Sequence, residues 1–368
     1  MRRLSGGNHL EKIMQVIQDI KPLDIRSMEE MRNCLNNLTK PLGSLGMLEE
    51  LPITLSGIAG HAAPKVDRKA IVVMCGDHGV VKEGVSAYPQ AVTGLMMDNF
   101  VRGKAAINVL ARQAGAEVQV IDIGSMLEEV PKEIIKKKVR YGTDNMAIGP
   151  AMSKEEAVQG IHIGIETAFD LADQGIDLLG IGEMGIGNTT PASAMTAVFT
   201  SISISQLTGR GTGINAAGLD KKIEVIERAI KGNNPNPMDP LDVLCKVGGF
   251  EIAGLVGVLL GAAARRIPVV IDGVISGAAA LAAYRIEPLS RDYMIASHLS
   301  AEPAHQFILN ELELKPLLNL EMRLGEGTGA ALAFPLIESS TRIFREMATF
   351  EELGIPAHVE NSKEKNEA

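Results

Sequence analysis

The spacing of apolar residues along the chain changes near residue 65. Between Leu10 and Ile20 apolar side chains recur at helical spacing, and residues 28–38 repeat that pattern. The first continuous apolar run, Ala70–Cys75, is rich in β-branched residues and ends at a glycine, which is typical of a strand buried on both faces. The pattern therefore predicts helices first and a sheet afterwards.

Further apolar runs predict more strands along the rest of the chain. They are Val118–Ile123, Leu178–Ile181, Pro268–Ile271, Tyr293–Ala296 and Leu317–Met322. Stretches with helical character, such as residues 91–114 and 154–174, lie between them. Strands that alternate with helices favour an α/β fold: a doubly wound, mostly parallel sheet covered on both faces.

The two ends of the chain carry helical patterns without strands of their own. We expect residues 1–65 and residues 336–368 to form a smaller helical domain together, beside a large α/β catalytic domain of residues 66–335. A last helix is predicted near residues 330–350, followed by a polar tail at residues 361–368.

Composition and charge narrow the range of partners. Hydrophobic residues make up 46% of the chain and charged residues 22%, which is typical of a globular protein. The net charge of -9 opposes binding to nucleic acid and to anionic membranes, and the absence of Trp removes the best base-stacking side chain. The longest apolar run, Ile252–Ala264, is too short to cross a bilayer. We therefore expect small-molecule partners, with neither nucleic acid nor membrane.

The cysteines and the N-terminal segment indicate a cytoplasmic location. Cys34, Cys75 and Cys245 form no C-x-x-C pair and are odd in number, which suits a reducing compartment. The opening residues lack the continuous apolar core of a secretion signal.

In parallel α/β proteins the chemistry lies in the loops that follow the strands. The first such loop here is Gly76-Asp77-His78-Gly79. The adjacent Asp and His could belong to a metal site, but no further ligands follow at a suitable spacing. A tight strand exit in which Asp77 binds backbone is the favoured interpretation.

Two glycine-rich loops could cradle a phosphate. Residues 182–191 read GEMGIGNTTP, where Thr190 is expected to cap a helix that has Pro191 at its first position. Glycines before a helix let backbone N–H groups converge on an anion, although an ordinary turn would look the same. The second loop, residues 209–213, precedes Lys221 and Lys222, of which Lys221 is expected on a solvated face.

Two later loops carry polar side chains of interest. Ser300, in residues 297–303, could donate a hydrogen bond to a phosphate, whereas a Ser/His/Asp triad is excluded because the chain has no G-x-S-x-G elbow. Glu326 lies between two glycines in residues 323–330. Partial desolvation would raise its pKa into the range of a general base, although an ordinary loop carboxylate is the alternative.

These loops together resemble the nicotinate-nucleotide–dimethylbenzimidazole phosphoribosyltransferase family, which acts in the lower-ligand branch of cobalamin synthesis. The resemblance spans residues 38–354. The segments that carry it are LTKPLGSLG (38–46), CGDHGVVKEGVSAYPQAVT (75–93), GEMGIGNTTPASA (182–194), TGRGTGI (208–214), SHLSAEPAH (297–305) and RLGEGTGAALA (323–333).

The resemblance implies an activity, an assembly and a set of site residues. The activity is transfer of the 5-phosphoribosyl group from nicotinate mononucleotide to 5,6-dimethylbenzimidazole, giving α-ribazole 5'-phosphate and nicotinate, without a cofactor or a metal. It implies a homodimer with a Rossmann-like large domain. Glu326 matches the general base of the family. The substrate-binding positions are Gln90, Glu183, Met184, Gly185, Gly211, Lys222, Ser300 and Leu324.

The implied chemistry agrees with the residues present. The donor's pyridinium leaves as a neutral heterocycle without an acid, so one carboxylate that removes the acceptor's proton suffices. A nucleotide-dependent oxidoreductase would carry its glycine fingerprint at the first strand exit, which reads GDHG here. A silent nucleotide-binding relative would have lost Glu326. Adenine or phenolic acceptors remain compatible with the same pocket.

Overall fold

The computed structural model describes residues 9–354, which form two compact units. The larger unit contains residues 9–22 and 67–335, and the smaller one contains residues 23–66 and 336–354. The polar tail at residues 361–368 lies outside the described residues.

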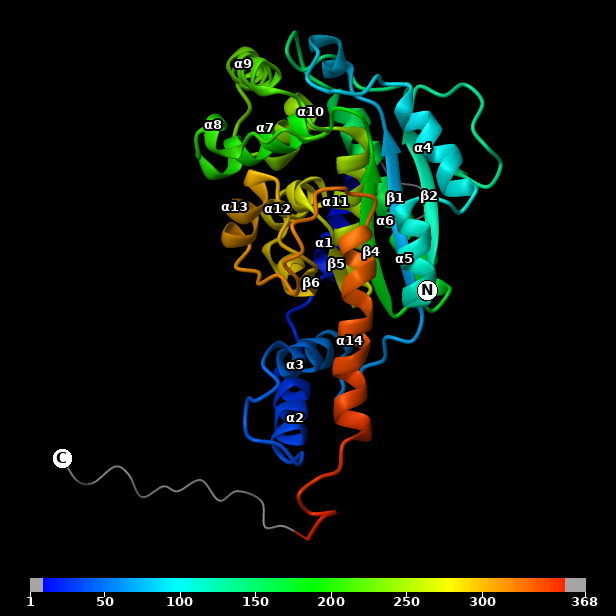
Figure 1. Ribbon diagram of the computed structural model, residues 1–368, viewed down its shortest axis with the longest axis vertical. Coiled ribbons are helices and arrows are strands. Elements are labelled where there is room, and N and C mark those ends of the chain that lie inside the picture. Colours follow the sequence, from blue (N-terminus) through cyan, green and yellow to red (C-terminus); the bar gives the residue numbers. More distant parts are fainter. Residues whose placement is uncertain (1–8, 355–368) are drawn as a thin grey trace, which may run out of the picture. The chain divides into compact units, whose positions relative to one another are not determined.

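A six-stranded, all-parallel sheet forms the centre of the larger unit, in the order β3-β2-β1-β4-β5-β6. This is the strand order of the doubly wound Rossmann arrangement, and it confirms the doubly wound, mostly parallel sheet that the sequence predicts. Figure 1 shows β1 beside β2 and β4. The strands are β1 (Lys69–Gly76), β2 (Ala116–Gly124), β3 (Ile135–Lys136), β4 (Leu178–Met184), β5 (Val269–Ile271) and β6 (Met294–Ala296).

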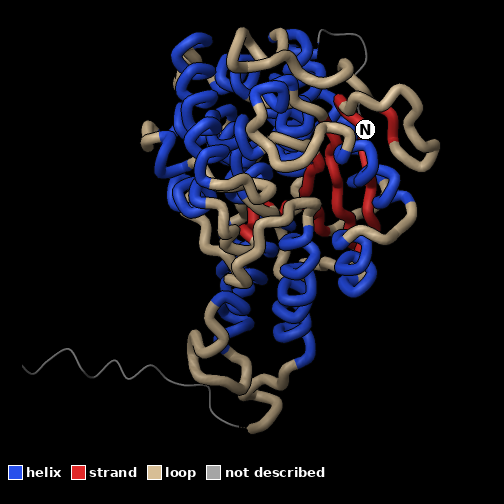
Figure 2. The backbone as a smooth tube through the Cα atoms, turned by 45° about the horizontal axis from the view of Figure 1, so that its top comes forward, coloured by secondary structure: helices blue, strands red, loops and turns tan. Residues whose placement is uncertain are grey.

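Helices surround this sheet, whose strands are red among blue helices in Figure 2. All residues of the central strand β1 are buried, which explains its uninterrupted apolar sequence. The helices of the larger unit are α1 (His9–Asp19), α4 (Val92–Val101), α5 (Ala106–Ala114), α6 (Lys154–Asp173), α7 (Thr189–Thr200), α8 (Ile204–Leu207), α9 (Ala216–Asn233), α10 (Pro240–Val247), α11 (Phe250–Ala264), α12 (Val274–Ile286) and α13 (Pro303–Glu311), with 3-10 turns η1 (Gly79–Glu83) and η2 (Pro288–Tyr293).

The order of strands in space explains where a site can form. The chain passes from β1 outward to β2 and β3, then returns to place β4 on the other side of β1. The loops after β1 and β4 therefore leave the sheet in opposite directions, and a crevice opens between them at the carboxyl ends of the strands. The GDHG and GEMGIG segments begin in the last residues of these two strands and continue into the loops.

Two of the predicted elements are wrong in detail. Residues 317–322 form no strand: the backbone N–H groups of Leu317 and Leu318 donate to Ala296 and Ser297, but no residue of the segment is buried and Glu321 has a φ of 55°. The single helix expected over residues 91–114 is divided into α4 and α5, because Gly103 has a φ of 69°.

The smaller unit is helical and draws on both ends of the chain. It contains α2 (Ile25–Asn36), α3 (Met47–Ala59) and the part of α14 (Thr328–Glu346) from residue 336 onward. Its core is Met31, Leu35, Leu38 and Ile53, against which Ile343 and Phe344 pack. A bridge between Leu38 and Thr349 joins the two chain segments.

The predicted domain boundary differs from the structure at one helix. The sequence places all of residues 1–65 in the small domain, but α1 belongs to the larger unit. Its buried residues Ile13 and Val16 lie on one face, and the helix packs on α6 and α11. An amphipathic period alone does not identify which core a helix joins.

Within residues 9–354, the structure contains no helix with the length and apolarity needed to span a membrane.

The helices α6 and α11 cross with their backbones in contact. A Cβ atom on Gly164 would lie 1.9 Å from the carbonyl oxygen of Gly254, and one on Gly257 would lie 1.9 Å from the carbonyl oxygen of Ile161. Real Cβ atoms do not approach backbone so closely, so only glycine permits this crossing.

We predict that G164A lowers the free energy of unfolding by about 1–3 kcal/mol or more, because the helices must move apart. The control is G232A in α9, where an added Cβ meets nothing within 4 Å and φ is not positive. That change is expected to add about 0.5–1 kcal/mol of stability. Urea unfolding of both variants measures the difference, and equal stabilities would contradict the proposed crossing constraint.

Candidate active site

A cavity of about 510 Å³ lies at the carboxyl ends of β4, β5 and β6, and we call it the Glu326 cavity. Its wall combines apolar side chains with backbone and polar groups from the glycine-rich loops. Among its lining residues are Tyr88, Val92, Met96, Glu183, Met184, Gly185, Asn188, Thr189, Gly211, Gly273, Ile275, His298, Ser300, Glu302, Arg323, Leu324 and Glu326.

The structure brings most of the predicted site residues into this one wall. Those that line it are Glu326, Glu183, Met184, Gly185, Gly211, Ser300 and Leu324. Gln90 does not line it, although Tyr88 and Val92 on either side do. Lys222 lies behind the wall and is fully buried.

Glu326 is a buried carboxyl group in an unusual backbone conformation. Its φ is 63°, between Gly325 at 90° and Gly327 at 86°, and the residue is 5% exposed. The backbone N–H of Ile107, in the first turn of α5, donates to its Oε2 at 3.4 Å. Burial raises the pKa of Glu326 above its ordinary value, and the hydrogen bond from Ile107 opposes this increase.

Glycines in these loops allow three segments to pass close to one another. A Cβ on Gly182 would lie 2.2 Å from the backbone nitrogen of Gly327, and one on Gly325 would lie 2.5 Å from Oε1 of Glu183. A Cβ on Gly185 would lie 2.3 Å from the carbonyl oxygen of Gly76. Close approach of the loops therefore requires glycine at these positions in the GEMGIG and RLGEG segments.

The predicted cap of α7 is wrong, and the actual cap has another function. The helix begins at Thr189 with Asn188 as its N-cap, and the Asn188 side chain makes no capping bond. That side chain donates instead to the Glu183 carboxylate. Burial, followed by the negative charge of Glu251, raises the pKa of Glu183 to about 8.

Lys221 and Lys222 have opposite environments, and the sequence predicts that of Lys221. Lys221 is exposed, which confirms its expected solvated position. The Nζ of Lys222 donates to Thr189 Oγ1 at 2.7 Å and to the carbonyl oxygen of Gly209 at 3.3 Å. Burial lowers the pKa of Lys222 to about 8, against the negative charge of Glu302, which acts to raise it.

Ser300 belongs to a hydrogen-bonded connection between two loops of the wall. The Ser300 N–H donates to Nδ1 of His305 at 2.9 Å, and the Ser300 hydroxyl oxygen accepts from the N–H of Glu302 at 3.3 Å. The Glu302 carboxylate then accepts from the N–H of Gly211 at 3.0 Å. The serine and the second glycine loop are therefore held at a fixed separation.

The GDHG loop is a tight strand exit, as the favoured interpretation of its sequence predicts. Asp77 Oδ2 accepts from the backbone N–H of Met126 at 2.8 Å. His78 Nε2 lies 2.5 Å from Oε1 of Glu251 inside the protein. Burial acts to lower the pKa of His78, but the charge and hydrogen bond of Glu251 outweigh it and the pKa is raised. Across the described residues no group of three or more His, Cys, Asp or Glu side chains could hold a metal ion.

Several functional candidates were missed in the sequence. Glu251 and Asp272 are single carboxylates within or at the end of apolar runs, and that contrast was the signal available. Glu302, His298 and Arg323 lie inside the motif segments but carry no distinctive spacing. Arg323 donates to the carbonyl oxygen of Gly211 at 2.7 Å and thus joins two of the loops.

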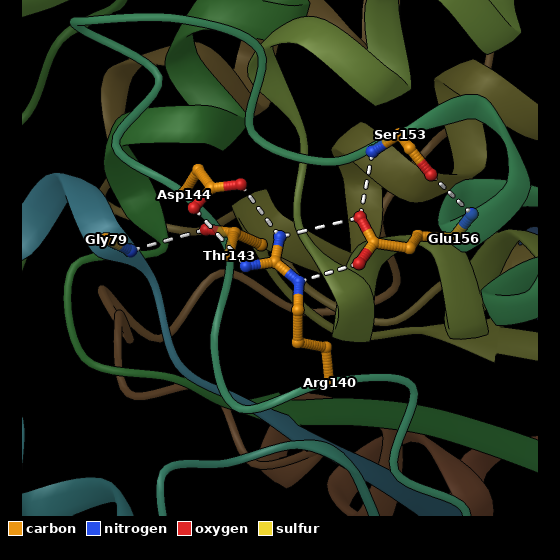
Figure 3. Close-up of polar contacts among 6 residues, drawn as sticks. All are labelled: Gly79, Arg140, Thr143, Asp144, Ser153 and Glu156. Carbon is orange, nitrogen blue, oxygen red and sulfur yellow. Dashed lines mark hydrogen bonds and ion pairs between the residues drawn. The ribbon is translucent and has the colours of Figure 1, made fainter.

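A second cavity, of about 780 Å³, contains none of the predicted site residues. Its central cation, Arg140, is already paired with the carboxylates of Glu156 and Asp144 (Figure 3). Lys246 is paired with Asp242 in the same cavity. Because these charges satisfy one another and none of the predicted site residues lines this cavity, the Glu326 cavity is the better candidate.

Comparison with known proteins agrees with this site. A family profile described as "Phosphoribosyltransferase" matches residues 20–355. A nicotinate-nucleotide–dimethylbenzimidazole phosphoribosyltransferase of Halalkalibacterium halodurans is 52% identical over 97% of this chain and all of that protein, and one of Clostridium acetobutylicum is 49% identical over 92% of this chain and 96% of that protein.

A solved structure is similar as well. The crystal structure of the enzyme of that name from Thermus thermophilus superposes with a TM-score of 0.86 at 43% identity, covering 90% of this chain and 99% of that one. The extent of these matches, together with the buried carboxyl group and the glycine-rich loops, shows that this chain is an enzyme and belongs to the nicotinate-nucleotide–dimethylbenzimidazole phosphoribosyltransferase family.

Proposed function

We propose that this enzyme transfers the 5-phosphoribosyl group of nicotinate mononucleotide to 5,6-dimethylbenzimidazole, with Glu326 as the general base. The two similar proteins described above are named for this activity. The observation that carries the proposal is the position of Glu326: a buried carboxyl group, with a raised pKa, in the wall of a cavity of about 510 Å³.

The polar part of the wall suits the donor's phosphate. Gly211 and Thr189 line the cavity, and Lys222 lies directly behind them with its Nζ on Thr189 Oγ1. A Cβ on Gly211 would lie 3.3 Å from that Nζ, so the bare backbone leaves the ammonium close to the cavity. Ser300 adds a hydroxyl to the same wall. These groups offer positive charge and hydrogen-bond donors to a phosphate.

The apolar part of the wall suits a methylated aromatic acceptor. Val92, Met96, Met184, Ile275 and Leu324 contribute aliphatic and thioether surface. Methionine adapts its shape to an aromatic ring and makes favourable sulfur–aromatic contacts. The cavity therefore supports a flat apolar heterocycle next to a charged ribotide.

The polar and apolar parts of the wall hold the donor and the acceptor for one displacement reaction. One nitrogen of the benzimidazole forms a bond to C1' from the face opposite the nicotinate, and the C1'–nitrogen bond to nicotinate breaks with its electron pair going to the pyridine ring. The configuration at C1' is thereby inverted from β to α. The proton on the other benzimidazole nitrogen passes to the carboxylate of Glu326. Holding both reactants in one cavity supplies further acceleration.

We also propose that the enzyme works as a homodimer in the cytoplasm, a proposal that the family resemblance supports. The molecular mass of the purified protein in solution tests the dimer.

We predict that E326Q lowers turnover by about a hundredfold or more, because the amide cannot accept the acceptor's proton. Binding of nicotinate mononucleotide should stay within about twofold of the wild type, since the amide keeps the shape of the wall. Release of nicotinate with and without dimethylbenzimidazole measures turnover. E156Q, beside Arg140 in the other cavity, is the matched control and should turn over normally. Wild-type turnover by E326Q would remove Glu326 from the reaction.

We predict that K222A weakens donor binding by about tenfold or more, because a buried ammonium that supports a phosphate is lost. K221A is the control, since that neighbouring side chain is exposed and should bind the donor like the wild type. Calorimetric titration with nicotinate mononucleotide measures the dissociation constant. An equal effect of both substitutions would mean that only general surface charge matters.

We predict that donor affinity falls as the pH rises above about 8. The pKa of Lys222 is lowered to about 8 in the free enzyme, and a phosphate favours the charged amine. Above that pH binding must take up a proton, so the dissociation constant rises by up to about tenfold per pH unit. K222A should lack this dependence between about pH 7 and 9.5. Parallel profiles for the two proteins would contradict the assignment.

A further inference from the structure

The loop that carries Glu326 needs an external support. Residues 325–327 all have positive φ, and Glu326 is the residue among them that carries a side chain. A side chain in the left-handed region is unfavourable, so surrounding groups must hold the loop in place. The backbone N–H groups of such a buried turn also need hydrogen-bond acceptors.

The carboxyl group of Asp272 accepts hydrogen bonds from this loop. It follows β5 directly and is 1% exposed. Its Oδ2 accepts from the N–H of Gly327 at 2.9 Å and its Oδ1 from the N–H of Gly329 at 2.7 Å. One carboxylate thus engages the residue after Glu326 and the second residue of α14.

The loop is also confined by groups around Asp272. Gly182 lies so close that a Cβ there would come within 2.6 Å of the Glu326 carbonyl oxygen. A Cβ on Gly329 would lie 2.0 Å from Nδ1 of His298 and 2.7 Å from Oδ1 of Asp272. With β4 on one side and the Asp272 carboxylate bound to its N–H groups, the loop has little room to adopt another path.

Asp272 does not line the Glu326 cavity, although its neighbour Gly273 and Glu326 do. Both of its oxygens are occupied by backbone N–H groups. Direct contact with substrate is therefore not its function, and any effect on the reaction must pass through the loop.

We propose that Asp272 is a positioning residue that holds Glu326 where it can remove the acceptor's proton. The inference rests on the proposed function of Glu326. It assigns to Asp272 a task distinct from that of the cavity wall: both oxygens fix the backbone of residues 327 and 329, and so orient the side chain of residue 326 toward the cavity.

The test is D272N, with D122N as the matched control. The amide of D272N has a similar size, but its nitrogen cannot accept a hydrogen bond, so one backbone N–H loses its partner. We expect turnover to fall about tenfold or more while donor binding stays within about twofold. Asp122 is equally buried, in β2, and its Oδ1 accepts from Ser125 N–H at 2.8 Å, but it does not line the cavity. D122N should turn over within about twofold of the wild type.

A double variant separates positioning from a general structural effect. If Asp272 acts through Glu326, D272N added to E326Q should lower turnover by less than about twofold, because the general base is already absent. If the two effects multiply, or if D272N turns over normally, the proposal is wrong. D272E keeps a carboxylate on a longer side chain and is expected to fall between D272N and the wild type. If D272N does not fold, D272E is compared with the wild type and with D122N in the same way.

Hydrogen–deuterium exchange provides a readout that does not depend on activity. Amides in residues 323–331 should exchange faster in D272N than in the wild type or in D122N. Unchanged exchange together with lost turnover would mean that Asp272 acts by another route and would overturn the proposal. If the wild type itself releases no nicotinate, the proposed function fails, and the exchange result alone decides whether Asp272 fixes the loop.

Discussion

The site depends on the contact between the Glu326 loop and strand β4. At Gly182 the strand has no side chain, and the backbone of residues 326 and 327 occupies the space that a Cβ would take. This contact brings a loop from the end of the catalytic unit's chain across a strand from its middle. The side chain of Glu326 is thereby placed beside Glu183 and Met184, which leave the same strand. Without such an approach, the segments of the cavity wall would be separate surface loops.

Four buried carboxyl groups lie in or near the wall of this cavity. Glu183, Glu251, Asp272 and Glu326 are all buried, and burial raises the pKa of Glu183, Asp272 and Glu326. The proposed donor carries a cationic pyridinium ring. Its positive charge favours the ionised form of nearby carboxyls, so arrival of the donor and readiness of Glu326 to accept a proton are coupled. Departure of nicotinate removes that charge and favours the protonated acid.

Much of the fold could be predicted because its central strands are buried on both faces. The run Ala70–Cys75 marks β1 to within one residue at each end. The run Leu317–Met322 is interrupted by Asn319 and Glu321, and it lies at the surface beyond the edge of the sheet. A short apolar run does not reveal whether a partner strand is available, since strand pairing depends on segments far away in the sequence.

The site residues were predictable to different degrees. Glu326 stands out because glycines flank it, and Gly182 and Gly185 stand out as part of one motif. The burial of Lys222 had a signal in the helical period, because Val225, Ile226 and Ala229 lie on the same buried face of α9. For Asp272 and Glu251 the only signal in the sequence was a carboxylate among apolar neighbours. Their importance comes from contacts with residues 327, 329 and 78, which no local pattern contains.

Gly211 affects how the charge of the buried Lys222 ammonium acts on the Glu326 cavity. Lys222 is wholly enclosed, and its ammonium lies next to the backbone of residue 211 and the Thr189 hydroxyl, both of which line the cavity. Because residue 211 has no side chain, the electric field of the Lys222 ammonium reaches a ligand in the cavity. Solvent is excluded from this region, so the field is weakly screened. A bulkier residue at position 211 would place its side chain between the Lys222 ammonium and a ligand in the cavity.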